Sequence, residues 1–214
     1  MSADVLHKIV FGNVPSSRFF GVAVGLVTNN QDPDGMARVK VKFPWLSDDD
    51  ESYWARLSVA MAGKDRGTYF LPEVGDEVLV AFEHGSADFP YVLGSLWNGK
   101  DQPPESNSDG NNDNRTIKSR SGHILRLCDK DGDEKIEIID KSGNNKITLK
   151  TSDNTLTIQA DSDITIQSKS GKLKLSGNGV EITSQADVKI QASSELDANA
   201  GSQMNLKGAM VNIN

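Results

Sequence analysis

The chain has 214 residues, of which 36% are hydrophobic, and a formal net charge of −7. This length is enough for one or two domains, and no apolar run approaches the roughly 18 residues that a membrane-spanning helix needs. The first 116 residues hold 10 basic and 17 acidic side chains, whereas the remainder is balanced, and this argues against a nucleic-acid binder with its basic patch.

The N-terminus and the cysteine content bear on the compartment. The N-terminus lacks the succession of basic, apolar and small residues that marks a signal peptide, so we expect no secretory signal. Cys128 is the only cysteine, so no disulfide can form within the chain. We therefore expect assembly in a reducing compartment.

The front half has the pattern of short β-strands. Apolar and polar positions alternate, valine and aromatic residues are frequent, and runs of Gly, Pro, Asp and Ser form turns between them. The predicted strands cover residues 20–27, 37–43, 54–60, 76–83 and 91–97. Five short strands in about 80 residues predict a small antiparallel barrel of the OB type. Such barrels often bind nucleic acid, but an acidic surface does not clearly offer the basic groove that this needs.

The chain as a whole is predicted to have four parts. They are an N-terminal segment (1–19), an OB-fold domain (20–100), a linker (101–115) and a repeat domain (116–214). The linker is rich in Pro, Ser, Asn and Asp and is too short to hold a further domain.

From about residue 136 onward, one apolar-x-apolar motif occurs ten times. The first residues of successive motifs are 11, 9, 8, 9, 7, 8, 8, 8 and 7 positions apart. A period near eight fits one short strand and one tight turn in each unit. No aromatic residue follows Trp97 and no proline follows Pro104. The repeat domain is therefore predicted to form a long, narrow β-helix whose hydrogen-bond ladder is not interrupted.

Units this short cannot readily close a core within one chain. Each unit offers about two apolar side chains, worth roughly 1.5–3 kcal/mol each when buried, against about 1–2 kcal/mol for ordering each residue's backbone. Three chains sharing one core solve this, so we predict an intertwined homotrimer. The predicted core residues are Ile136, Ile138, Ile147, Leu149, Leu156, Ile158, Ile164, Ile166, Leu173, Leu175, Val180, Ile182, Val188 and Ile190. A single-chain β-solenoid and a disordered polar tail are the alternatives, and sustained periodicity argues against disorder.

Several motifs, in one order, resemble a known family. They lie at residues 32–46 (DPDGMARVKVKFPWL), 52–56 (SYWAR), 72–82 (PEVGDEVLVAF) and 90–100 (PYVLGSLWNGK), and continue at 109–113 and 119–123. These runs resemble the OB domain of contractile-injection spike proteins. The family includes the VgrG spikes of type VI secretion, the baseplate protein V of contractile phages and the spikes of phage-tail-like extracellular particles. The resemblance implies an OB barrel followed by a trimeric β-helix, in agreement with the reading of the repeats.

The chain differs from larger members of the family in three ways, and these differences lead to expectations about its partners. About 19 residues precede the barrel, so we expect the hub domain of VgrG chains to be a separate protein here. No lysozyme domain interrupts the linker. Some spikes end in a metal-binding His-x-His tip, whereas His7, His84 and His123 are far apart.

The resemblance implies a structural, non-enzymatic spike at the centre of a baseplate, piercing the target envelope when the sheath contracts. It implies assembly in the bacterial cytoplasm, as part of a virion or of an injection particle that can be released. The hub is expected to dock at Phe11, Phe19 and Phe20. A PAAR-like tip protein is expected to cap the apolar residues of the last repeats, Met204, Leu206, Met210, Val211 and Ile213. Contact with the target membrane is transient, and no cofactor, metal or nucleic acid is expected.

Other functions fit the sequence less well. His123 and Cys128 could pair as base and nucleophile, but in the first strands of a narrow rod a structural role is favoured. Asp129, Asp131 and Asp133 suggest a calcium loop, yet Gly132 comes too early and no Glu closes the loop. An envelope-degrading enzyme would need a catalytic insert. A trimeric receptor-binding fibre or adhesin remains the main alternative, although such fibres usually end in an aromatic-rich or loop-rich head.

Overall fold

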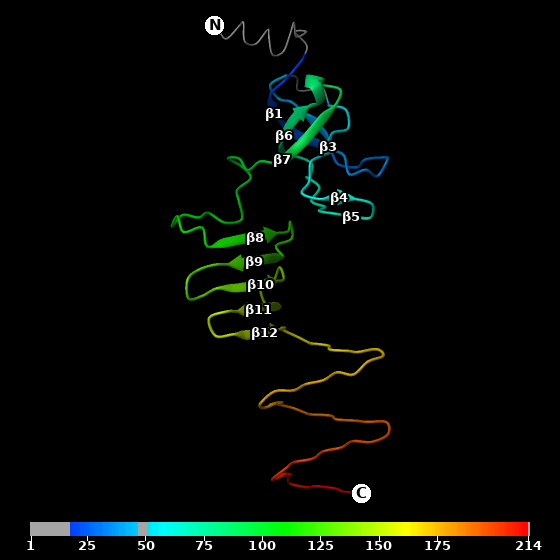
Figure 1. Ribbon diagram of the computed structural model, residues 1–214, viewed down its shortest axis with the longest axis vertical. Coiled ribbons are helices and arrows are strands. Elements are labelled where there is room, and N and C mark those ends of the chain that lie inside the picture. Colours follow the sequence, from blue (N-terminus) through cyan, green and yellow to red (C-terminus); the bar gives the residue numbers. More distant parts are fainter. Residues whose placement is uncertain (1–17, 47–50, 214) are drawn as a thin grey trace. The chain divides into compact units, whose positions relative to one another are not determined.

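The computed structural model describes residues 18–46 and 51–213, which contain almost only β-structure (Figure 1). The chain divides into two compact units, Met1–Asp161 and Ser162–Asn214. The first unit holds every strand of the described residues, in two five-stranded sheets and one two-stranded hairpin. This confirms the predicted all-β class. Among the described residues, no helix has the length and apolar character needed to cross a bilayer.

The first sheet curls into the OB-like barrel predicted for the front half (Figure 1). Its order is β2-β1-β6-β7-β3, and all neighbours are antiparallel except the parallel pair of β3 and β7. Its strands are β1 (Val22–Asn29), β2 (Lys40–Lys42), β3 (Arg56–Leu57), β6 (Glu77–Phe82) and β7 (Pro90–Ser95). The sequence did not predict the hairpin of β4 (Ala62–Gly63) and β5 (Arg66–Gly67), nor the short 3-10 helix η1 (Glu83–Gly85).

The core of the barrel is small and consists mostly of valine. Alternate residues of each strand face inward, and the buried set is Val27, Val39, Val41, Phe43, Ala55, Val78, Val80 and Val92. β-Branched side chains suit this role because they pack well on a pleated surface and lose little rotamer freedom in a strand. The barrel is therefore held by the same alternation that predicted its strands.

All five predicted barrel strands are present, and two of them are much shorter than predicted. The strand predicted at 37–43 shrinks to β2 because Ala37 has a φ of 56°, which is incompatible with a strand, and because Pro44 has no N–H to extend the ladder. The strand predicted at 54–60 shrinks to β3, preceded by a single bridge from Ala55 to Val39.

The second sheet is an antiparallel meander in the order β12-β11-β10-β9-β8 (Figure 1). Its strands are β8 (Asn114–Lys118), β9 (Ile124–Cys128), β10 (Lys135–Ile139), β11 (Lys146–Lys150) and β12 (Thr155–Gln159). The turns before and after β10 contain Gly132 and Gly143, whose φ values of 74° and 78° lie in the left-handed region that glycine enters without strain. Each turn returns the chain directly beside the preceding strand.

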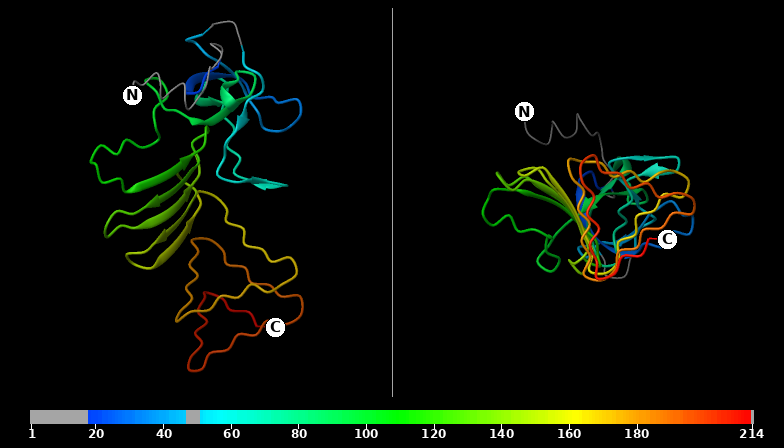
Figure 2. Two further views of the ribbon diagram at one scale, coloured as in Figure 1. Left: turned by 45° about the horizontal axis from the view of Figure 1, so that its top comes forward. Right: turned by 90° about the horizontal axis from the view of Figure 1, so that it is seen from below.

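The second unit has a different organisation. Residues 162–213 contain no helix or strand, and within this range no backbone N–H donates to a backbone carbonyl. Figure 2 shows this part as an open, winding chain. The change falls near residue 160, where the spacing of successive motifs becomes about eight residues. The predicted β-helix is not formed by one chain alone, and it remains a prediction.

Candidate functional site

The second sheet has one apolar face, made of two columns of side chains that run across its strands. Cross-strand register aligns Leu125 with Ile138 and Ile147, and it aligns Leu127 with Ile136 and Leu149. We call this surface the apolar face; its members are Ile117, Leu125, Leu127, Ile136, Ile138, Ile147, Leu149, Leu156 and Ile158. Because the side-chain period of a strand is two, all nine point to the same side of the sheet.

The apolar face is largely uncovered in a single chain. Eight of its nine side chains are between 39% and 62% exposed, and the ninth, Ile147, is intermediate. A contiguous apolar surface of this kind is typical of an interaction site rather than of a solvated face. The structure therefore brings the first six predicted core residues together on one surface, and their burial between chains remains a prediction.

The opposite face of the same sheet is polar and internally paired. Arg126 on β9 lies 3.0 Å from Glu105 and 3.6 Å from Glu137 on β10. The Thr116 hydroxyl also donates to Glu105, at 2.8 Å. The hydrogen bond from Thr116, followed by the contacts with Arg126, holds the pKa of Glu105 below its usual value. Apart from the cross-strand pair of Ile124 and Ile139, this face is mainly polar, in contrast to the apolar face.

A second polar cluster lies at the start of β10. Asp133 contacts the ammonium groups of Lys135 at 3.0 Å and of Lys150 at 3.9 Å. The hydrogen bond from Lys135 is the main reason that the pKa of Asp133 is lowered. Asp133, considered in the sequence as a calcium ligand, is therefore engaged with lysines. Among the residues that the structure describes, no group of three His, Cys, Asp or Glu side chains could hold a metal ion.

The carboxylate of Asp140 organises the turn between β10 and β11. It accepts hydrogen bonds from the Ser142 hydroxyl at 2.7 Å and from the Asn145 amide at 2.9 Å. Together with backbone donors, these bonds lower the pKa of Asp140 to about 2. Such a turn fixes the register of the two strands, and with it the alignment of the apolar columns.

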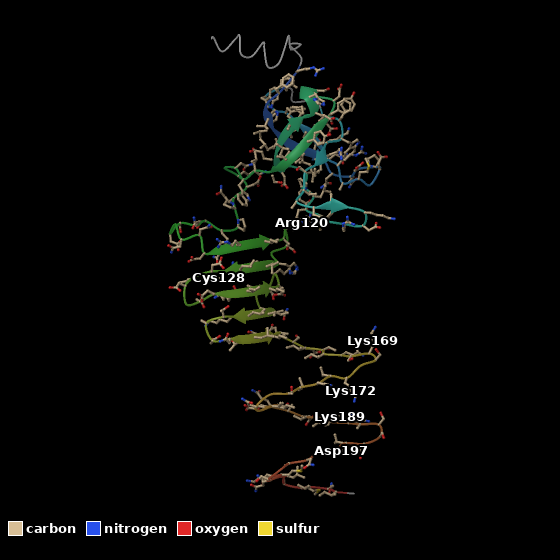
Figure 3. The ribbon with its side chains drawn as sticks, viewed as in Figure 1. Arg120, Cys128, Lys169, Lys172, Lys189 and Asp197 are labelled. Atoms are coloured by element: carbon tan, nitrogen blue, oxygen red, sulfur yellow. The ribbon has the colours of Figure 1, made fainter. Side chains whose placement is uncertain are left out.

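The apolar-x-apolar motifs of residues 162–213 are also exposed. The side chains of Ile164, Ile166, Leu173 and Leu175 are all at least half exposed, as are those of Val180, Ile182, Val188 and Ile190. Figure 3 shows the side chains along this chain, with Lys169, Lys172, Lys189 and Asp197 labelled. The apolar side chains of this unit are exposed, and among its described residues no backbone N–H donates to a backbone carbonyl.

The residues predicted to bind a tip protein lie in this unit. Met204, Leu206, Met210, Val211 and Ile213 are each about half exposed or more. They share the exposure of the preceding repeats, and nothing in their geometry distinguishes them as a separate site.

Two of the three residues predicted to dock a hub line a groove on the barrel. Phe19 packs against Trp45 with ring centroids 5.5 Å apart and against Phe82 at 5.9 Å. Phe20 lines the same groove and is 53% exposed. The third residue, Phe11, lies outside the described residues.

The pair considered as a catalytic base and nucleophile has other surroundings. The Nδ1 atom of His123 accepts a hydrogen bond from the backbone N–H of Lys141 at 3.2 Å. Cys128 lies on the polar face, in register with Lys135 and Asn114 (Figure 3). His123 precedes β9 and Cys128 ends it, so the two lie at opposite ends of one strand.

Sequence reasoning missed the most highly paired group of the barrel. The carboxylate of Asp32 lies 2.6 Å from the Arg38 guanidinium and accepts hydrogen bonds from the backbone N–H groups of Asp34, Met36 and Arg38. The hydrogen bond from Arg38 holds the pKa of Asp32 well below its usual range. The run Asp-Pro-Asp-Gly was the available signal, since aspartate accepts bonds from the backbone that follows it.

Comparison with known proteins identifies the barrel. Residues 23–97 match the family model of the type VI secretion system/phage-baseplate injector OB domain. The spike protein VgrG1a of Pseudomonas aeruginosa is 34% identical over 117 residues, which cover 49% of this chain and 18% of that protein. The spike protein VgrG3 of Vibrio cholerae is 36% identical over 75 residues, covering 33% of this chain and 7% of that protein.

A further relative from Vibrio cholerae is named actin cross-linking toxin VgrG1 and is 35% identical over 75 residues. The chain therefore spans less than a fifth of the length of each of these relatives. The comparisons confirm the resemblance to VgrG-like baseplate spikes and the OB fold of residues 23–97.

Proposed function

We propose that this chain is a structural spike at the centre of a contractile injection machine, in which three copies form one rigid needle. The observation that carries the proposal is the apolar face of the second sheet, continued by the exposed motifs of residues 162–213. The injector OB domain and the VgrG relatives support the setting, a type VI secretion system or a phage baseplate.

The apolar face favours association with further copies of the same chain. It presents two parallel columns, and three such faces packed around one axis enclose a triangular core. Each side chain that becomes fully buried contributes about 1.5–3 kcal/mol. The polar face, with Arg126 paired to Glu105 and Glu137, then forms the outer surface.

Residues 162–213 add a second argument for an intertwined assembly. Their backbone groups make no ladder within the chain, and a β-helix requires such a ladder. In an intertwined trimer the partners of each strand belong to the other two chains. Separating one chain then requires the bonds of many layers to break together, and this cooperativity makes the needle stiff.

Assembly with other proteins completes the proposed machine. A separate hub docks on the barrel at Phe11, Phe19 and Phe20, and a small conical tip protein covers the last repeats around Met204 and Ile213. The spike forms in the bacterial cytoplasm, and sheath contraction drives it through the target envelope. The exposure of Phe19 and Phe20 and of the last repeats supports these two attachment points.

We propose a mechanical role, without catalysis by this chain. Several of its acidic groups serve the fold: Asp32 pairs with Arg38, Glu105 with Arg126 and Asp133 with Lys135. The toxin named among the relatives is matched over only 7% of its length, so its activity does not transfer to this chain.

The test is the mass and the exchange behaviour of the purified full chain. Light scattering should give about three times 23.2 kDa. Hydrogen exchange should show protected amides in residues 162–213, which have no backbone partner within one chain. A folded monomer with freely exchanging amides in this range would overturn the proposal.

A further inference from the structure

The hairpin of β4 and β5 extends from the barrel as a separate two-stranded sheet (Figure 1). We call residues 58–67, which contain this hairpin, the arm, and every residue of the arm is exposed. An isolated two-stranded hairpin is at best marginally stable in water. The arm is therefore typical of a segment that packs against a partner.

Two glycines set the shape of the arm. A Cβ at Gly67 would lie 2.7 Å from the Met61 carbonyl oxygen, and a Cβ at Gly63 would lie 3.0 Å from the Arg66 guanidinium. Because Gly63 is paired with Arg66 and follows Met61 by two residues, the side chains of Arg66 and Met61 lie on the same face of the hairpin. This face combines a cation with an apolar side chain that is 52% exposed.

The tip of the arm carries two cations. Lys64 and Arg66 stand on either side of Asp65, and among the described residues neither cation forms a salt bridge. A surface that is complementary to the arm therefore presents carboxylates around an apolar or aromatic side chain.

A groove with this chemistry lies at one end of the barrel. It has a volume of about 550 Å³, and it is lined by three carboxylates and an indole, those of Asp76, Glu77, Asp101 and Trp97. We call it the acidic groove. Trp97 is 69% exposed, and none of the three carboxylates forms a salt bridge with another described residue. The basic residues of the lining are Lys118 and Arg120, and Arg120 is paired with Glu73 at 2.9 Å.

The arm and the acidic groove lie at the same end of the barrel, on opposite sides of β7. β3 is parallel to β7, so the chain leaves β3 toward the arm at the end where β7 finishes at Ser95. β6 is antiparallel to β7 and begins at Glu77, in the groove, so the groove lies at this end as well. In the order β6-β7-β3, the strands that lead to the groove and to the arm flank β7. No residue of the arm lines the groove, and both surfaces consist of described residues only.

We propose that the arm of each copy binds the acidic groove of the next copy, so that three equivalent contacts close a ring. This inference rests on the proposed function, because it requires the trimer. Two different surfaces on opposite sides of β7 suit a head-to-tail contact, and such contacts close into a ring when each copy is rotated by a third of a turn. Their opposite charges favour a second copy as the partner.

The contact combines charge with an apolar anchor. Lys64 and Arg66 face the carboxylates of the neighbouring copy, and Met61 packs on the Trp97 ring of that copy. The arm thereby gains the packing that an isolated hairpin lacks.

Disulfide trapping in the full chain tests the contact. In a Cys128→Ser background, Met61→Cys is combined in turn with Trp97→Cys and with Asp101→Cys. We expect mild oxidation to give dimer and trimer bands on a non-reducing denaturing gel with at least one combination, whereas each variant with a single cysteine gives only the monomer band. The matched control combines Met61→Cys with Phe89→Cys, an exposed residue just before the start of β7, and should give no such bands.

Exchange of charges gives an independent readout. Arg66→Glu should lower the melting temperature of the trimer because it faces carboxylates, and Asp101→Arg should lower it because it faces cations. The double variant Arg66→Glu/Asp101→Arg should recover most of the loss, since the reversed pair attracts again. Light scattering of each protein measures the oligomeric state separately.

The other outcomes overturn the contact. A trimer without any cross-link between chains, or one in which the double variant recovers no stability, would exclude the contact and leave the proposed spike standing. A monomer in light scattering would exclude both. A cross-link within one chain, seen as a monomer band of altered mobility, would mean that the arm folds onto its own groove.

Discussion

Ile136 of β10 lies directly opposite Leu149 of β11, and both side chains remain more than 40% exposed. Cross-strand pairs of this type stabilise a sheet through contact between the two side chains, but their outer surfaces stay in water. The same arrangement recurs at Leu125 and Ile138. We propose that other copies of the chain cover this face, and the first two predictions test that proposal.

Ile138→Asp should prevent assembly of the trimer. It places three carboxylates around one narrow axis, where each buried unpaired charge costs several kcal/mol. The control is Thr157→Asp on the polar face of β12, where the residue lies opposite the uncharged Thr148 and is exposed, so the change should be mild. Light scattering and thermal melting of the two variants measure the difference. Equal effects would show that the apolar face is not the buried one.

The same contrast between apolar and intervening polar positions should hold in residues 162–213. Ile166→Asp or Leu175→Asp should sharply reduce trimer stability, whereas Thr165→Asp, at the intervening position of the motif, should have little effect. Ile166 and Leu175 are at least two-thirds exposed in one chain, so a monomeric protein would tolerate both changes. An Ile166→Asp variant that resists heat as well as the wild type does would therefore contradict a core shared between chains.

The stability of the barrel should depend on pH through Asp32. Its pKa is depressed in the folded state by Arg38, so this group adds stability above its unfolded pKa of about 3.9. That contribution is lost as the pH falls through the lower folded pKa. We expect Arg38→Gln to lower the melting temperature by a constant amount from pH 5 to 7, and the gap to the wild type to narrow below about pH 4. A difference in melting temperature between the two proteins that does not depend on pH would rule out this role of the Asp32–Arg38 pair.

Removal of residues 1–19 should weaken co-purification with the hub and leave the trimer intact. The deletion takes away Phe11 and Phe19, and the latter packs on Trp45 and Phe82. Co-purification from the producing cell, compared with the full chain, measures the effect. Phe19→Ala is the smaller change with the same expected direction, and undiminished recovery of the hub with both variants would count against docking here.

Truncation of residues 208–214 should abolish capture of a tip protein without dissolving the trimer. The truncation removes Met210, Val211 and Ile213, all exposed in one chain. Pull-down of a conical tip protein by the full and truncated spikes compares the two. Electron microscopy of whole particles that shows a bare, blunt needle end would contradict the capped tip.

The barrel could be predicted from the sequence because its core depends on local alternation. The alternation of Val39, Val41 and Phe43 marks the inward face of β2 without knowledge of the fold. Its ends could not be read in this way, since Ala37 adopts a left-handed φ for reasons set by the Asp32 loop. The hairpin of β4 and β5 was missed because Ala62, Gly63 and Gly67 carry no strand signal.

The period of the repeat domain could be predicted from the sequence, but the position of its first repeat was missed. The motif of Leu125 and Leu127 on β9 precedes the first predicted repeat and lies on the same face. Leu125 precedes Ile136 by the same 11 residues that separate Ile136 from Ile147, so the spacing was an available signal for this earlier motif. The change from a meander to an open chain near residue 160 could not be predicted, because the apolar-x-apolar motif continues unchanged across it.

Glu105 has a consequence for how force passes along the chain. It lies in the connection between Ser95 at the end of β7 and Asn114 at the start of β8, and it is fastened to Thr116 on β8 and Arg126 on β9. The part of the connection that precedes the first anchor on the sheet is therefore residues 96–104 and not residues 96–113. In the proposed spike, a load on the barrel would therefore pass to β8 and β9 together through residues 96–104.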